Sequence, residues 1–247
     1  MTKINQRITN YFIFTRTPLY SLIFTLPLFF IYELGIVFTN TNDLMSLRNG
    51  ADSLMRETLE IFGIFGFYGI GAIFLLSVVF VFLFQKKYLK DILLKMDYLF
   101  LMMVESFFWS IMLYLFMSFV LKNSHLLILG TRSKLLIQQV ILSVGAGIYE
   151  ELVFRVLLIA GISVIIGFVF QWHGYLKNWV AMFISAGLFS SFHFFGEFGD
   201  WFSFNIFMIR FFAGIVLGAL YFTRGFGITA WTHSIYDLIV LINNTTQ

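Results

Sequence analysis

The 247-residue chain contains no cysteine, only two prolines and few charges, since Asp, Glu, Lys and Arg make up 12% of it. The lack of cysteine excludes a disulfide scaffold, a thiol nucleophile, an iron–sulfur cluster and a thiolate zinc site. By contrast, 60% of the residues are hydrophobic, among them 34 phenylalanines. Such a chain has too little polar surface to cover a water-soluble globule. It is therefore predicted to be an integral membrane protein, without a separate soluble domain.

The hydrophobic residues form long continuous runs rather than short alternating segments, which favours helices over a barrel of strands. A spanning helix takes about 20 residues. The predicted spans cover residues 18–38, 61–84, 98–121, 135–170, 175–195, 205–222 and 228–242. The run at 135–170 is longer than one crossing needs, so we expect one long tilted helix or a broken pair. The fold class is all-α, a polytopic transmembrane helix bundle of about seven to eight spans with an intramembrane polar cavity.

The net charge of +3 comes from basic residues that lie between the hydrophobic runs and form no basic stripe. This distribution predicts a lipid bilayer and no nucleic acid as partner. The excess of Lys and Arg in alternate connectors favours a cytoplasmic N-terminus. Residues 40–60 are polar, with leucines and methionines at helical spacing, and are predicted to form either an interfacial helix or a solvated loop.

Ionisable residues at membrane depth are the most informative, because each charge costs about 2.5 to 3.5 kcal/mol on insertion scales. They form three groups, each inside a predicted helix: Glu150, Glu151 and Arg155 in EELVFR, Phe189 and His193 in FSSFH, and His233 and Asp237 in HSIYD. The four charged residues alone would carry a penalty on the order of 10 kcal/mol. We expect these groups to meet in one polar cavity, where they compensate one another.

The spacing of these residues indicates roles. Glu151 and Arg155 are four residues apart on one helix face and can neutralise each other. Glu150 points about 100° away, so it is predicted to be the general base. His233 and Asp237 are also four apart, so the carboxyl group either fixes the ring or shares a cavity with it. Histidines and a free carboxylate around a wet pocket suit activation of water, hence hydrolysis. The alternative is a set of buried pairs that hold the bundle together.

The ordered motifs EE-x-x-x-R, F-x-x-x-H and H-x-x-x-D, on successive hydrophobic helices, resemble those of the CPBP intramembrane protease family. This family includes the CAAX prenyl endopeptidases and the bacterial bacteriocin-processing or Abi-type proteins. The resemblance covers about residues 135–242. It implies that Glu150 activates water and that His193 helps to hold or protonate the reacting groups. It also implies that His233 and Asp237 lie near the developing oxyanion.

By the same resemblance, Glu151 and Arg155 are a supporting pair. The family often has Asn where this chain has Asp237, and an ionised Asp would repel an oxyanion. Asp237 is therefore expected to be protonated, to orient His233, or to bind a cation.

The resemblance implies an endopeptidase in a bacterial cell membrane, acting on a peptide or membrane-protein substrate such as a small secreted precursor. Residues 1–134 would form N-terminal transmembrane helices with an interfacial segment, and residues 135–247 the catalytic core helices of a single membrane domain. No cofactor is expected to be required. The soluble metalloprotease motif HExxH is absent, but a divalent metal such as zinc, held by His193, His233 and a glutamate, remains an alternative.

A rival function is a non-catalytic membrane partner that binds a peptide, toxin or sensor protein through the polar cavity, as in immunity. A proton-coupled transporter is a weaker third alternative. Among the other polar residues, His125 and His173 are predicted to lie at the membrane interface. Glu33, Glu105 and Arg210 are predicted to form interhelical pairs.

Overall fold

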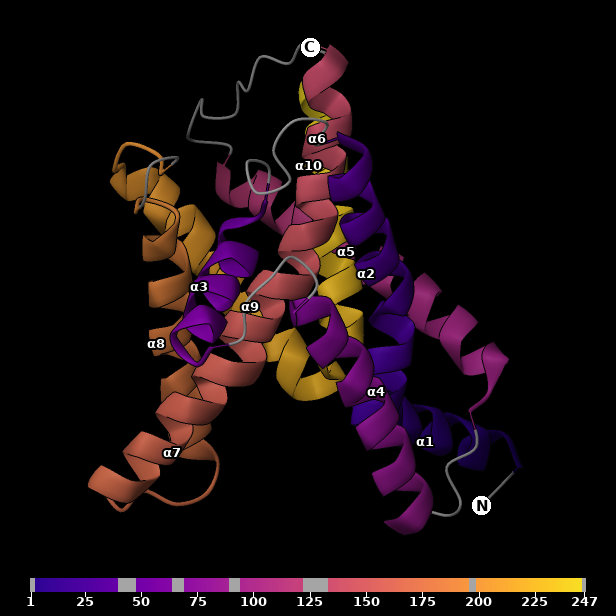
Figure 1. The fold of residues 1–247 in the computed structure, drawn as a ribbon. Coiled ribbons are helices and arrows are strands. Elements are labelled where there is room, and N and C mark those ends of the chain that lie inside the picture. Colours follow the sequence, from indigo (N-terminus) through magenta and orange to yellow (C-terminus); the bar gives the residue numbers. More distant parts are fainter. Residues whose placement is uncertain are drawn as a thin grey trace.

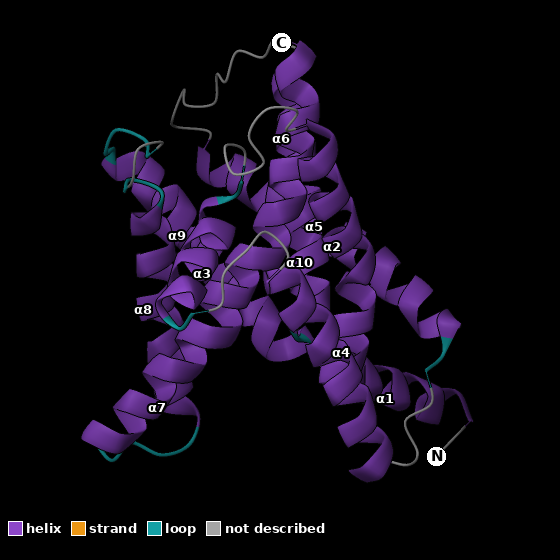
Figure 2. Ribbon diagram, in the orientation of Figure 1, coloured by secondary structure: helices purple, strands orange, loops and turns teal. Residues whose placement is uncertain are grey.

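The computed structural model describes residues 3–39, 48–63, 69–88, 94–121, 133–195 and 199–245. Every regular element among these residues is a helix, without a strand (Figures 1 and 2). The first helices are α1 (Lys3–Thr15), α2 (Pro18–Thr39), α3 (Gly50–Ile61), α4 (Gly69–Tyr88) and α5 (Met96–Leu121). They are followed by α6 (Ser133–Gly145), η1 (Ala146–Glu150), η2 (Leu152–Leu158), α7 (Ile159–Val169), α8 (Tyr175–Phe192), α9 (Phe204–Arg224) and α10 (Phe226–Thr245).

Each apolar run predicted as a span contains a helix. Within the described residues, four helices are long and apolar enough to cross a membrane: Pro18–Thr39, Met96–Val120, Leu136–Val169 and Phe204–Arg224. A shorter apolar helix covers Gly69–Phe84. The described residues are thus all-α, and their four long apolar helices indicate a multi-pass membrane protein. The count of seven to eight spans stays a prediction.

The long run that begins near residue 135 forms one uninterrupted helix rather than a broken pair. The apolar part alone covers 34 residues, Leu136–Val169, or about 51 Å at 1.5 Å per residue, against a hydrocarbon core of about 30 Å. In its middle, η1 and η2 have π-helical hydrogen bonding, and Glu150 and Glu151 lie where the two meet. Such wide turns in a helix often mark functional sites.

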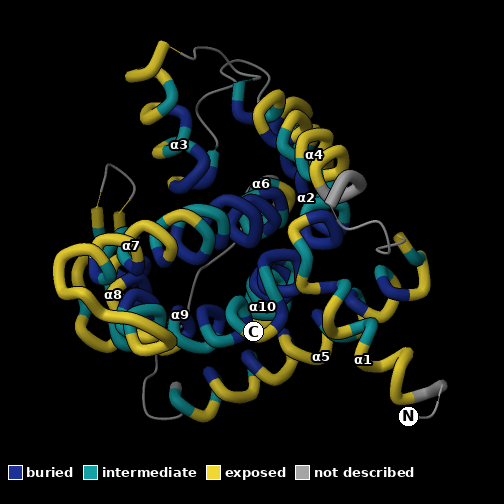
Figure 3. The backbone as a smooth tube through the Cα atoms, turned by 90° about the horizontal axis from the view of Figure 1, so that it is seen from below, coloured by how far each residue is buried: buried dark blue, intermediate teal, exposed yellow. Residues whose placement is uncertain are grey.

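Helix α10 lies at the centre of the bundle and packs against α2, α5, α6, α9 and η1. Figure 3 shows buried residues where α2, α6 and α10 meet, and exposed ones along the outer sides of α4, α5 and α7. Many of these outer residues are large and apolar, for example Phe80, Phe107 and Val164. Lipid chains can cover such apolar faces, whereas their exposure to water would be unfavourable.

Glycines let several helices approach closely. A Cβ atom on Gly147 of η1 would lie 2.4 Å from the carbonyl oxygen of Ala230 in α10. On Gly218 of α9 it would lie 2.6 Å from a side-chain carbon of Met182 in α8. At the end of α9, Gly225 has a φ of +81°, which permits the sharp turn into α10.

The polar segment that was predicted as an interfacial helix or a loop contains α3, and this helix is docked into the protein. Asn49 caps its N-terminus by accepting a hydrogen bond from the backbone N–H of Ala51. Two buried charges, Asp52 and Arg56, pair with each other at 2.7 Å. Arg56 also lies 3.1 Å from Glu33 of α2. The prediction that Glu33 forms an interhelical pair is therefore confirmed.

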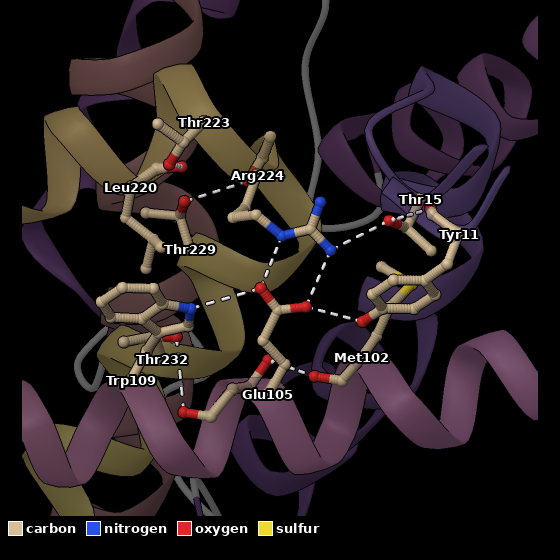
Figure 4. A network of polar contacts seen from close by, with 12 residues as sticks. Tyr11, Thr15, Met102, Glu105, Trp109, Leu220, Thr223, Arg224, Thr229 and Thr232 are labelled. Carbon is tan, nitrogen blue, oxygen red and sulfur yellow. Dashed lines mark hydrogen bonds and ion pairs between the residues drawn. The ribbon is translucent and has the colours of Figure 1, made fainter. Parts of the chain in front are cut away.

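Glu105 of α5 joins three parts of the chain (Figure 4). Its carboxylate accepts hydrogen bonds from Arg224 at the end of α9, at 2.5 and 2.7 Å, and from the Tyr11 hydroxyl of α1 at 2.6 Å. Burial and the bond to Glu105 raise the pKa of Tyr11 above its usual value, so the phenol remains a donor. The predicted interhelical pairing of Glu105 is confirmed. Arg210 pairs at 2.6 Å with Asp200, which lies before α9.

Candidate active site

The six predicted site residues come from three parts of the bundle. We call them the polar cluster: Glu150, Glu151 and Arg155 of the long π-containing helix, His193 at the end of α8, and His233 and Asp237 of α10.

Glu150 and Glu151 are both buried, at 6% and 0% exposure, so their carboxylates need partners inside the protein. Because neighbours on a helix point in different directions, each has its own set. Oε1 of Glu150 accepts a hydrogen bond of 2.8 Å from the side-chain amide of Asn49. Oε2 of Glu150 lies 4.0 Å from Nε2 of His193, beyond direct hydrogen-bonding distance.

Glu151 serves two partners at once. Its Oε2 pairs with Nε of Arg155 at 3.0 Å, one turn along the helix, which confirms the predicted pair. Its Oε1 lies 2.7 Å from Nδ1 of His233 on α10. Since a carboxylate can only accept, Nδ1 of His233 carries the hydrogen of this bond. Glu151 therefore links the long helix to α10 and fixes the orientation of the His233 ring.

His193 is held by the way in which α8 ends. The helix stops at Phe192, and His193 is its C-cap. The last carbonyl groups of a helix lack backbone partners, and Nδ1 of His193 lies 2.9 Å from one of them, the carbonyl oxygen of Phe189. A carbonyl only accepts, so Nδ1 is the donor and Nε2 is left to face Glu150.

The ring of Phe189 lies among three members of the polar cluster. The guanidinium of Arg155 stacks over it, 4.3 Å from the ring centroid. The rings of His193 and His233 meet it edge-on, with centroids 5.0 and 6.2 Å away. Such contacts stabilise a cation that has little access to water, and they exclude water from one side of the cluster.

Asp237 is less buried than the glutamates, with 29% of its side chain exposed. Its Oδ2 lies 3.6 Å from Nε2 of His233, so the closer partner of that ring is Glu151. Asp237 and Asn49 both line a pocket of about 300 Å³ between α6 and α10. Two larger cavities, of about 1070 and 750 Å³, are lined by other residues than those of the polar cluster.

Residues 132–239 match the model of the Rce1-like type II CAAX prenyl endopeptidase family. The chain contains an Rce1-like protease domain. No curated protein and no solved structure matches the chain.

The Rce1-like domain runs from α6 to α10 and contains the whole polar cluster. The resemblance that the three motifs indicate is thus confirmed for residues 132–239, which match a family of proteases. This family implies intramembrane protease activity on a peptide or protein substrate. The roles of individual residues rest on the geometry described above.

Asn49 is the site residue that the sequence motifs did not reveal. It lies outside the Rce1-like domain and reaches Glu150 because α3 packs against η1. Its position before a helix is the signal for an N-cap. That role holds Oδ1 against Ala51, so the amide nitrogen points to Glu150.

Two other histidines of the chain are not members of the polar cluster. His173 is exposed in the connection between α7 and α8, away from the polar cluster, and His125 lies outside the described residues. No group of three His, Asp or Glu residues within the described ranges is arranged so that it could hold a metal ion.

Proposed function

We propose that the chain is an intramembrane endopeptidase that hydrolyses a peptide bond of a membrane-associated or small secreted peptide precursor, with water activated by Glu150. The observation that carries this proposal is the 4.0 Å separation between Oε2 of Glu150 and Nε2 of His193. One water molecule spans such a gap between two polar atoms. In a bacterial cell membrane, with the N-terminus in the cytoplasm, the bilayer would surround this site.

The hydrogen bonds around the gap orient a water for attack. With Nδ1 of His193 occupied by Phe189, neutral Nε2 is an acceptor, and Oε2 of Glu150 is another. A water between them donates both of its hydrogens, and its lone pairs are directed at a carbonyl carbon. As the carbon–oxygen bond forms, Glu150 takes one proton, which is then delivered to the leaving amine. Asn49 keeps Glu150 in place through its other oxygen.

His233 is suited to stabilise the oxyanion of the tetrahedral intermediate. Glu151 binds Nδ1 at 2.7 Å and balances a positive charge on the ring. In the charged ring Nε2 also carries a hydrogen, and it donates this hydrogen to the developing oxyanion. Arg155 in turn neutralises Glu151, so the pair supports the histidine rather than the substrate. The proposed step uses side chains alone and requires no cofactor.

The test compares peptide termini in membrane and secreted fractions of matched cells that express the wild type, Glu150→Gln or Glu60→Gln at equal abundance. Glu60 is an exposed glutamate of α3 and serves as the matched control. We expect defined termini to disappear with Glu150→Gln and to persist with Glu60→Gln. Identical termini in all three would refute the peptidase and favour a binding role. With purified protein, metal chelators should leave the cleavage rate unchanged.

A further inference from the structure

The small pocket beside the polar cluster is lined by acceptor groups. It is bounded by Asn49 and Asp237 at the cluster and by Gln139 and Ser143 of α6. The side-chain oxygen Oε1 of Gln139 is buried and has no hydrogen-bond partner among the described residues. An unsatisfied buried acceptor costs about 1 to 3 kcal/mol, so this oxygen indicates a missing donor.

Other polar groups of the wall add further acceptors. The amide nitrogen of Asn49 donates one hydrogen to Glu150, and its oxygen accepts from Ala51. The hydroxyl of Ser143 donates its hydrogen to the backbone oxygen of Gln139. Its lone pairs remain available, as do those of Asp237. A ligand that supplies several hydrogens would satisfy these acceptors.

The charge of the pocket has one sign. Asp237 is the only charged side chain among the described residues that line it. The nearest cationic group, Nε2 of His233, lies 3.6 Å from its carboxylate, too far for a direct hydrogen bond. The carboxylates of Glu150, Glu151 and Asp237 outnumber the Arg155 guanidinium and a charged His233 together. Arg210, whose charge also acts on Asp237, is paired with Asp200 at 2.6 Å. The local field therefore attracts a cation.

The remaining wall is apolar and is formed by Leu142, Ala146, Val240 and Leu241. At about 300 Å³, the pocket is at the lower end of the range for ligand sites, so it holds a single side chain with its flanking backbone. Long basic side chains match this combination, because their aliphatic stems pack on apolar surface and their heads carry several donors.

We propose that this pocket binds a lysine or arginine side chain of the substrate next to the scissile bond, with the charged head between Asp237 and Oε1 of Gln139. The proposal rests on the peptidase function proposed above and names a determinant of its substrates. It also gives Asp237 a role, since this carboxylate then binds a cation of the substrate.

The test uses the full chain, purified and reconstituted in lipid nanodiscs, and a library of N-acetylated decapeptides with randomised positions. Cleaved bonds are mapped by mass spectrometry, and Glu150→Gln defines the background. We expect lysine and arginine to be enriched at one fixed position beside the cleaved bond. Gln139→Leu should reduce this enrichment about tenfold, the equivalent of one hydrogen bond to a charged group. Gln139→Glu should increase it.

The neighbouring Gln138 does not line the pocket, so Gln138→Leu is the matched control and should leave the enrichment unchanged. Continued cleavage of peptides without basic residues shows that each variant is folded. Absence of enrichment, or enrichment that survives Gln139→Leu, overturns the proposal while leaving the peptidase intact. Absence of any Glu150-dependent cleavage overturns both.

A second library with free N-termini separates the side chain from another source of the same cation. Equal preferences in the two libraries support binding of a basic side chain. A preference for bonds close to the N-terminus that disappears on acetylation would mean that the pocket takes the terminal ammonium group, and it would overturn the proposal.

Discussion

The contact between Gly147 and α10 gives a sharp prediction about the link between packing and the site. A Cβ atom at this position would lie 2.0 Å from Oγ of Ser234 and 2.4 Å from the carbonyl oxygen of Ala230. The serine hydroxyl can rotate away, but the carbonyl belongs to the backbone. Carbon and oxygen atoms in contact lie about 3.3 to 3.6 Å apart, so Gly147→Ala must push the two helices about 1 Å apart.

Both the stability and the activity should respond to this displacement. Overpacking of a buried contact costs about 1 to 3 kcal/mol. For a chain of this size that lowers the Tm by about 2 to 12 °C. His233 is next to Ser234 on the displaced helix, so its bond to Glu151 lengthens. A misplacement of 1 Å in a site lowers the rate by about a hundredfold.

Thermal unfolding in detergent and cleavage of a peptide by purified protein measure the two effects. Gly161→Ala is the matched control, because a Cβ atom on this helical glycine meets nothing within 4 Å. The control should be at least as stable as the wild type, since alanine favours a helix over glycine by about 0.5 to 1 kcal/mol. If Gly147→Ala is as stable and active as the Gly161→Ala variant, the close approach of η1 and α10 is wrong.

Two further predictions concern single polar side chains. Asn49→Ala should lower the cleavage rate by about 10- to 150-fold while the variant stays folded, because a hydrogen bond to a charged group is worth about 1.5 to 3 kcal/mol. A full cleavage rate at an unchanged Tm would show that Glu150 needs no support from α3. Arg224→Met should lower the free energy of unfolding by about 1 to 3 kcal/mol, since it leaves the half-buried Glu105 without its cation. In thermal unfolding, the double variant Arg224→Met/Glu105→Gln should recover much of the lost stability. A double variant no more stable than Arg224→Met would contradict the pairing.

Much of the site was predictable because it is local in the sequence. Charged residues are costly in an apolar helix, so their mere presence at 150, 151, 155 and 237 pointed to a shared cavity. The spacing of four residues placed Arg155 within reach of Glu151, and the structure has them 3.0 Å apart. Phe189 and His193, also four apart, are connected by a hydrogen bond from Nδ1 of the His193 ring to the backbone carbonyl of Phe189.

Other partners could not be predicted from spacing. The same rule of four residues offered Asp237 either as the group that fixes His233 or as its neighbour in a cavity, whereas the shorter contact of His233 is with Glu151, which is 82 residues away. Asn49 reaches Glu150 across 101 residues and from outside the Rce1-like domain. The periodicity of a helix reports which side chains share a face, but not which face of another helix they meet.

From the sequence we could infer a bundle of membrane helices, ionisable groups that must compensate one another, and three motifs that resemble those of a protease family. These conclusions follow from the solvation cost of single side chains and from the geometry of one helix. The packing of the helices, which no sequence pattern reports, places Glu151 against His233, Asn49 against Glu150, and a small pocket beside Asp237. Each of these depends on how two helices approach, which is set by close contacts such as that of Gly147 with α10.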